Sequence, residues 1–188
     1  MTDLRTRWQP IAQVNHNTIP PQLLDCLLHS GSLTRFLEYW CRGHLALHLN
    51  NQSWQKPILD EALALRLDSG RFAFVREINF TCDHVPWVYG RSILPAATIS
   101  GSERRLAHWG QRSLGSYLFS GKNIRRGRIE VARLNAGSDL HDLVTAYHGE
   151  TGTGVWARRS IFYIREKPLL VVEVFLDNLV QCITTAKK

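Results

Sequence analysis

The sequence contains no apolar run that approaches the roughly 18 residues needed to cross a membrane as a helix. We therefore expect no membrane span. The first residues include an early acidic side chain, Asp3, and no apolar block of the length found in secretory signal peptides. We therefore expect no export signal and a location in the cytoplasm.

Cysteine is scarce, and the chain has only Cys26, Cys41, Cys82 and Cys182. These residues are widely spaced and form no CxxC or CxxH pair, which argues against a zinc knuckle and offers no disulfide framework. His44 and His48 lie on one face of a predicted strand, but no third ligand stands nearby with suitable spacing. We therefore expect reduced, mostly buried cysteines and no metal site.

Proline is also infrequent, with seven residues, whereas 44% of the chain is apolar and six residues are tryptophan. This composition excludes a disordered chain. A length of 188 residues fits one domain that buries a substantial core. We therefore expect a single domain over residues 1–188.

Acidic residues are outnumbered, with 16 Asp and Glu against 23 Lys and Arg, so the net charge is +7. Such an excess favours an anionic partner, and nucleic acid, acidic lipid or a small polyanion would satisfy it. The cations are scattered, however, without a lysine-rich tail or a long basic helix. A helix-turn-helix over residues 102–119 would end in the segment SLGSYLF, which is short, apolar and poor in base-reading side chains. We expect no nucleic-acid partner.

The segment Phe74–Pro95 predicts a β-hairpin that turns at Asp83-His84, with Arg76 on its first strand and Arg91 on its second. The period of two places Arg76 on the same side as three apolar neighbours that should line the interior. A guanidinium in such a place requires a partner. The partner is either a protein carboxylate or the carboxylate of a ligand, and the sequence leaves both interpretations open.

Two segments predict helical hairpins. Residues 20–41 contain Pro20-Pro21 at the start of a leucine-striped helix and a Ser-Gly-Ser break before a second short helix. Residues 102–119 contain a helix that stops at Gly110 and another that begins near Ser113. Such a hairpin serves as a packed corner or as a lid.

The remaining segments predict further strands over residues 44–49, 128–134, 155–164 and 168–176. Residues 50–53 predict a turn or loop, and residues 59–67 predict a short strand or extended segment. Residues 135–154 form an excursion from the sheet with a short helix. In the last strand Glu173 stands alone in an apolar run. It is either the partner of an inward arginine or a carboxylate with a raised pKa, and both remain open.

The strings VREINF, PWVYGRSILP, SLGSYLF, GVWARRSIFY and KPLLVVEVFL, in this order and spacing, resemble the chorismate lyases. The likeness covers about residues 21–176. These enzymes (chorismate pyruvate-lyases) make 4-hydroxybenzoate for ubiquinone. The resemblance implies an α+β fold: a single antiparallel sheet of about six strands, helices on one side, and the two helical hairpins as lids over an internal ligand site. For such a reaction we expect no cofactor and a monomer, and we expect inhibition by the product, because 4-hydroxybenzoate keeps the ring carboxylate of chorismate.

The resemblance also implies roles for five residues. The family's carboxylate-binding arginine falls on Arg76, its second active-site arginine on Arg91, and its catalytic-site glutamate on Glu173. The lids donate main-chain N–H groups at Leu33 and Leu114. We expect Arg76 to bind the ring carboxylate of chorismate and Arg91 to bind the enolpyruvyl group. Glu173 is expected at C4 as an orienting group or a proton carrier.

Two departures from the family pattern are visible. Leu33 stands where a family member has methionine, which is harmless if only the main-chain N–H is used. The excursion Asn135–Thr153 is mostly absent from that member, so the entrance on that side is expected to differ. The runner-up function is that of the ligand-sensing domain of GntR-type transcription regulators, which resembles the same fold. No winged-helix domain precedes the matching region, which disfavours sensing alone.

Overall fold

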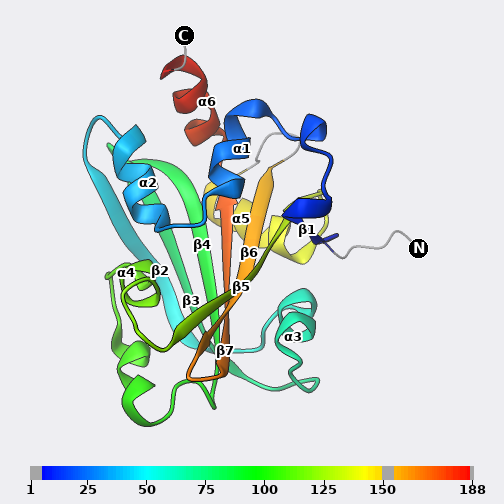
Figure 1. The fold of residues 1–188 in the computed structure, drawn as a ribbon, viewed down its shortest axis with the longest axis vertical. Coiled ribbons are helices and arrows are strands. Elements are labelled where there is room, and N and C mark those ends of the chain that lie inside the picture. Colours follow the sequence, from blue (N-terminus) through cyan, green and yellow to red (C-terminus); the bar gives the residue numbers. More distant parts are fainter. Residues whose placement is uncertain (1–5, 150–154, 187–188) are drawn as a thin grey trace.

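A computed structural model describes residues 6–149 and 155–186 and contains one seven-stranded antiparallel sheet (Figure 1). The strand order is β1-β5-β6-β7-β4-β3-β2. The predicted α+β class and single antiparallel sheet are confirmed. One strand more than the expected six is present because Gln9 and Pro10 pair with β5. The N-terminal residues 1–5, which entered the prediction of no export signal, and the end of the predicted excursion lie outside the described residues.

The strands are β1 (Gln9–Pro10), β2 (Leu45–Gln55), β3 (Ala73–Cys82), β4 (Val85–Pro95), β5 (Ile124–Arg133), β6 (Trp156–Ile164) and β7 (Lys167–Phe175). The α-helices are α1 (Pro21–Leu28), α2 (Leu33–Trp40), α3 (Leu59–Leu65), α4 (Leu114–Leu118), α5 (Asp139–His148) and α6 (Asp177–Ala186). Short 3-10 helices cover Ile11–Gln13, His16–Thr18 and Gly101–His108. No helix in these described ranges combines the length and apolar character that crossing a bilayer requires.

The predicted β3–β4 hairpin is present, and its two-residue turn has positive φ at Asp83 (47°) and His84 (67°). This backbone suits the right-handed twist of a tight hairpin. The pairing is interrupted once: Phe80 pairs with Val88, whereas Thr81 pairs with Pro86. One extra residue of β4 is therefore accommodated by a bulge close to the turn.

Helices pack on both faces of the sheet, which corrects the expectation of helices on one side. Leucines of α1 and α2 pack on one face against residues that include Ile78 of β3. Leu65 of α3 and Leu140 of α5 pack on the other face in a cluster that includes Val75. Val75 and Ile78 point to opposite sides because side chains alternate along a strand. In Figure 1, α1 and α2 accordingly lie in front of the sheet and α5 behind it.

Three local predictions require correction. Within the segment 59–67, expected to be a strand or extended, residues 59–65 form helix α3. Glu61 in its first turn accepts a hydrogen bond from the N–H of Ile58, which stabilises the helix start. The predicted turn at 50–53 is part of β2, which absorbs the polar residues with an irregularity between Leu49 and Asn51. The excursion contains the expected short helix, α5, but α5 packs on the face opposite α1 and α2.

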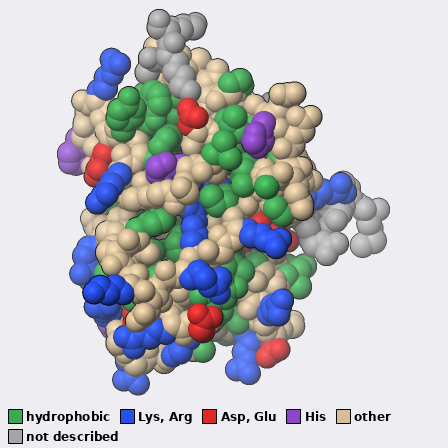
Figure 2. Space-filling model, viewed as in Figure 1, with side chains coloured by type: hydrophobic (Ala, Val, Ile, Leu, Met, Phe, Trp, Pro, Cys, Tyr) green, Lys and Arg blue, Asp and Glu red, His purple; other side chains and the backbone are tan. Residues whose placement is uncertain are grey.

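The space-filling view agrees with the scattered charge of the sequence. Several Lys and Arg side chains lie over the lower half of this face, with acidic and other side chains between them (Figure 2).

The structure joins Cys41, which follows α2, to Cys82 at the end of β3 in a disulfide with a Cα–Cα distance of 5.8 Å. The expectation of four reduced cysteines is wrong for this pair. The two residues are 41 positions apart in the chain, and the pairing of β2 with β3, which begins with Leu45 opposite Cys82, brings them together. Cys26 and Cys182 are outside this disulfide.

We predict that the Cys41–Cys82 bond stabilises the protein by about 2–4 kcal/mol, because it closes a loop of 41 residues in the unfolded chain. The double variant Cys41→Ser/Cys82→Ser should lower the free energy of unfolding in urea by that amount. Cys182→Ser serves as the control. Thiol labelling of the unfolded, unreduced protein should modify two cysteines; modification of all four would contradict the bond.

Candidate active site

A pocket lies on the face of the sheet that α1 and α2 cover, and its floor consists of two rows of side chains across four strands. The first row is Ile78, Gly90, Glu173 and Arg158. The second row is Arg76, Ser92, Val171 and Ser160. Gly90 has no side chain, and the side chain of Ile78 lies so close that a Cβ at Gly90 would meet its Cγ1 at 2.9 Å.

The two predicted helical hairpins form the roof of the pocket. Gly31, Leu33 and Thr34 line it from the start of α2, and Ser113, Leu114 and Gly115 line it from the start of α4. The hydroxyl groups of Thr34 and Ser113 lie 2.8 Å apart and form a hydrogen bond that joins the two hairpins. The helical hairpins therefore occupy the place that lids would occupy.

Leu33 and Leu114 are the first residues of α2 and α4, so their N–H groups belong to helix starts. The side chain of the preceding serine caps neither helix: Ser32 and Ser113 make no capping hydrogen bond. First-turn N–H groups without a cap suit the binding of an anion. Both residues predicted to supply main-chain donors, Leu33 and Leu114, therefore line the pocket.

Arg76 is 2% exposed and lies on the pocket floor as expected. Its Nη2 atom donates to the carbonyl oxygens of Gly110 and Arg112, each at 2.8 Å. No carboxylate among the described residues pairs with it, and its buried Nε has no hydrogen-bond partner there. Burial lowers the pKa of Arg76 to about 10, so the group is still charged at neutral pH. The protein-carboxylate interpretation of Arg76 thus finds no partner among the described residues.

Arg91 is not brought to this pocket. It is buried on the opposite face, where Nε donates to Glu61 and Nη1 donates to Glu77, both at 2.7 Å. Burial acts to raise the pKa of Glu77, but hydrogen bonds from Tyr89 and Asn51 and the charge of Arg91 outweigh it and lower the pKa. Arg91 therefore has the protein partners that Arg76 lacks, and the expectation that both arginines share one site is corrected.

The bulge near the β3–β4 turn is the physical reason why Arg91 lies on the face opposite the pocket. Counted back from Asp83-His84 without interruption, the hairpin would place Arg91 opposite Arg76. The bulge shifts the pairing by one residue, so that Arg91 lies opposite Glu77 and Arg76 opposite Ser92. A shift of one residue moves a side chain to the other face of the sheet.

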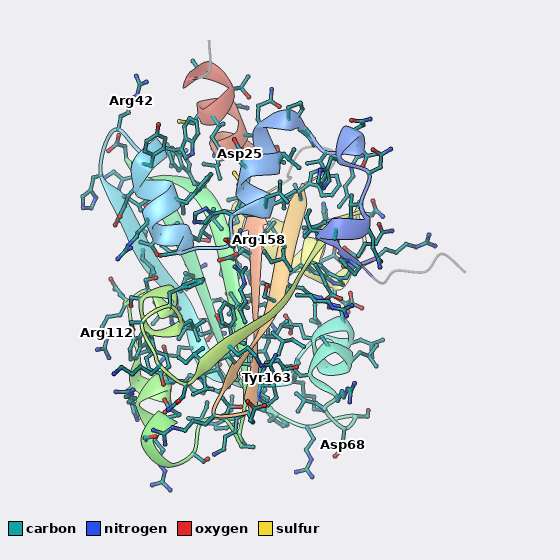
Figure 3. All side chains as sticks on the ribbon, in the orientation of Figure 1. Asp25, Arg42, Asp68, Arg112, Arg158 and Tyr163 are labelled. Atoms are coloured by element: carbon teal, nitrogen blue, oxygen red, sulfur yellow. A yellow bond between two sulfur atoms is a disulfide. The ribbon has the colours of Figure 1, made fainter. Side chains whose placement is uncertain are left out.

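Glu173 lies on the pocket floor, and the structure confirms that an inward arginine is its partner. Nε of Arg158 donates to Oε2 of Glu173 at 2.5 Å, and the two residues face each other across β6 and β7. Nη1 of Arg158 donates to the carbonyl oxygens of Cys26 and His29, each at 2.6 Å. Arg158 thus connects Glu173 to the C-terminal end of α1 and to His29, which follows it; in Figure 3 Arg158 lies beneath this helix.

Sequence reasoning missed two pocket arginines, Arg126 of β5 and Arg158 of β6. The signal for Arg158 was its alternation with Trp156, Ser160 and Phe162, which all point to one face of β6. Arg126 carried no such signal, because β5 contains an irregularity between Arg126 and its next paired residue.

The sequence of this chain is similar to a known family profile and to named relatives. The sequence profile described as chorismate lyase matches residues 3–184. The chain belongs to the chorismate lyase family. A relative from Methylococcus capsulatus, named probable chorismate pyruvate-lyase, is 43% identical over 78% of this chain and 89% of its own length. A chorismate pyruvate-lyase from Photorhabdus laumondii is 31% identical over 95% of this chain and 93% of its own length.

Solved structures share the fold at low identity. The C-terminal domain of PhnF matches with a TM-score of 0.56 and 12% identity over 72% of this chain and 85% of that domain. The effector domain of PhnF from Mycobacterium smegmatis matches with a TM-score of 0.51 and 16% identity over 80% and 91% of the two chains. These likenesses show the fold alone, so the assignment to the chorismate lyase family rests on the sequence relatives and the profile.

We predict that Arg91 stabilises the fold instead of binding substrate. Arg91→Met should reduce the free energy of unfolding by about 3–5 kcal/mol, because Glu61 and Glu77 would remain buried without their cation. Urea denaturation measures the effect. Arg71→Met, at an exposed arginine paired with Asp68, is the control and should change stability by less than about 0.5 kcal/mol. Unchanged stability combined with a higher KM for substrate would contradict this assignment.

Proposed function

We propose that this chain is a chorismate pyruvate-lyase, which converts chorismate to 4-hydroxybenzoate and pyruvate. The observation that carries the proposal is Arg76: a buried guanidinium on the pocket floor, without a carboxylate partner among the described residues, in a chain of the chorismate lyase family. The ring carboxylate of chorismate supplies the missing partner. The net charge of +7 attracts a dianionic substrate.

Arg76 binds the ring carboxylate together with the N–H groups of Leu33 and Leu114. The guanidinium approaches from the sheet and the two N–H groups from the lids, so the carboxylate is held where the lids meet the floor. A charge-assisted pair of this kind is worth roughly 1.5–3 kcal/mol. Closure of the lids excludes water and strengthens the same interactions.

The reaction breaks the bond between ring C3 and the ether oxygen of the enolpyruvyl group and removes the hydrogen from C4. This hydrogen passes to the side-chain methylene through a six-membered arrangement and completes the methyl group of pyruvate. The ether oxygen becomes the keto oxygen of pyruvate, and the ring becomes aromatic. The atoms balance without an oxidant, a metal or an organic cofactor, so the protein contributes mainly the position of the two reacting groups.

Glu173 orients the C4 end of the ring. Arg158 holds Oε2 of Glu173, and no other donor among the described residues contacts this carboxylate. Oε1 therefore accepts a hydrogen bond from the C4 hydroxyl group of the substrate. For Arg91 we propose a supporting role: through Glu77 it fixes the β3 backbone next to Arg76.

We also propose that the enzyme works as a monomer in the cytoplasm, supplies 4-hydroxybenzoate for ubiquinone, and binds no nucleic acid. One chain provides both lids and the whole floor of the pocket, so the site does not need a second copy. The alternative is a sensing domain that binds a small acid without converting it, which the shared fold of the PhnF domains favours.

Purified protein incubated with chorismate should release 4-hydroxybenzoate and pyruvate in equal amounts. Arg76→Gln should lower kcat/KM roughly tenfold to a hundredfold, because it removes the charged half of the carboxylate interaction. Its melting temperature should remain near that of the wild type, as should the kinetics of the exposed control Arg71→Gln. Binding of chorismate without turnover would favour the sensing domain. A large drop in the melting temperature of Arg76→Gln, with normal kinetics of the fraction that remains folded, would make Arg76 structural.

We expect product release to limit turnover, because 4-hydroxybenzoate keeps the ring carboxylate that Arg76 and both lids bind. Rapid mixing with excess chorismate should show a burst of product, and added 4-hydroxybenzoate should slow the initial rate. Thr34→Val removes the hydrogen bond to Ser113 that joins the lids, and it should increase the rate at which product dissociates. An initial rate that is insensitive to added product, with no burst, would mean that the lids are ordinary packed corners.

A further inference from the structure

We infer that Arg126 determines the preference of the site for substrate over product, by binding the carboxylate of the enolpyruvyl side chain. This inference rests on the proposed function. It concerns a residue that enters the pocket from β5, at the end of the floor opposite Arg76 of β3.

The charges of the pocket provide the first argument. Among its described lining residues, three arginines, Arg76, Arg126 and Arg158, face a single carboxylate, Glu173. Glu173 pairs with Arg158. Two guanidinium groups are therefore left without a carboxylate, and chorismate has two carboxylates. Buried or half-buried cations without counterions favour an anionic ligand.

The surroundings of Arg126 provide the second argument. Its Nε donates to the hydroxyl of Ser160 at 3.0 Å and its Nη1 to the carbonyl oxygen of Ser30 at 2.9 Å, and both acceptors are uncharged. Nη2 makes no hydrogen bond to any described residue. Burial, and next the positive charge of Arg158, lower the pKa of Arg126 to about 10. The guanidinium is thus held in place by neutral groups while its charge remains uncompensated.

The positions of the two arginines provide the third argument. Strands β6, β7 and β4 lie between β5 and β3, so Arg126 and Arg76 reach the pocket from opposite ends. Glu173 of β7 and Gly90 of β4 lie on the floor between them. A ring bound there has its own carboxylate at Arg76, its reacting C4 end beside Glu173, and its side chain directed toward Arg126.

Arg158 is the less suitable group for this carboxylate. Its Nε is engaged by Glu173, and its Nη1 donates to the carbonyl oxygens of Cys26 in α1 and of His29, which follows α1. These contacts compensate its charge and occupy its donors. Arg158 is a positioning residue for Glu173 and the first lid, which leaves Arg126 for the second substrate carboxylate.

The two carboxylates separate when the reaction is complete, and this separation makes the inference testable. The ring carboxylate stays on 4-hydroxybenzoate, whereas the side-chain carboxylate leaves with pyruvate. Loss of Arg76 therefore weakens the binding of both substrate and product. Loss of Arg126 weakens the binding of the substrate but not the binding of 4-hydroxybenzoate.

The experiment compares Arg126→Met with the neighbouring control Arg125→Met, whose exposed side chain stacks on Tyr163. Arg126→Met should lower kcat/KM for chorismate roughly tenfold to a hundredfold, mainly through KM, and leave the Kd of 4-hydroxybenzoate within about twofold of the wild type. Arg125→Met should change neither quantity. Arg126→Lys, which restores the charge without the planar fork, should recover part of the loss.

Equal weakening of substrate and product by Arg126→Met would overturn the inference, because Arg126 would then act only by holding the lid at Ser30. An unchanged kcat/KM would overturn it as well. If Arg126→Met does not fold, the same comparison is made with Arg126→Lys and with Arg126→Gln. If the wild type does not convert chorismate, the proposed function fails, and calorimetric titration with chorismate and with 4-hydroxybenzoate still tests Arg126 through the ratio of the two Kd values.

Discussion

One extra residue of β4 lies between the paired residues Phe80–Val88 and Thr81–Pro86. This bulge decides which side chains of β3 and β4 share a face of the sheet. It places Arg76, Ile78 and Gly90 in the pocket floor and turns Arg91 toward Glu77 on the other face of the sheet. Without it the two arginines would lie side by side on one face. The rest of the site depends on this register, because β7 and β6 continue the same rows with Glu173 and Arg158.

The two faces of the sheet provide different partners for a buried arginine. Behind the sheet, Arg91 is surrounded by Glu61, Glu77 and the hydroxyl of Tyr89, which itself bonds Glu77, so the charge is neutralised within the fold. In the pocket, Arg76 has only main-chain carbonyl groups as acceptors. An uncompensated buried charge is costly to the empty protein, and a ligand carboxylate removes that cost. The two arginines therefore differ in their partners: Arg91 is neutralised within the fold, whereas Arg76 has no carboxylate partner among the described residues.

The same pocket arginines connect ligand binding to the lids. Arg76 donates to the carbonyl oxygens of Gly110 and Arg112, just before α4, while Arg126 and Arg158 donate to carbonyl oxygens of residues between α1 and α2. In the proposed function, a carboxylate bound by one of these guanidinium groups therefore also acts on the lid to which that group is hydrogen-bonded. The PhnF domains share the sheet, and a common fold does not determine the chemistry of the site.

The sequence by itself determined the antiparallel hairpins, the two helical hairpins and the inward direction of Arg76, because alternation and turn chemistry are local. The motifs also located Glu173, Leu33 and Leu114. Only the tertiary structure decided the face of Arg91, since a bulge of one residue changes parity without a clear sequence signal. It also decided that residues 59–65 form a helix covering Arg91, that Cys41 meets Cys82, and that Arg126 enters the pocket. The disulfide and the place of Arg126 depend on segments distant in the chain, whose meeting no local pattern encodes.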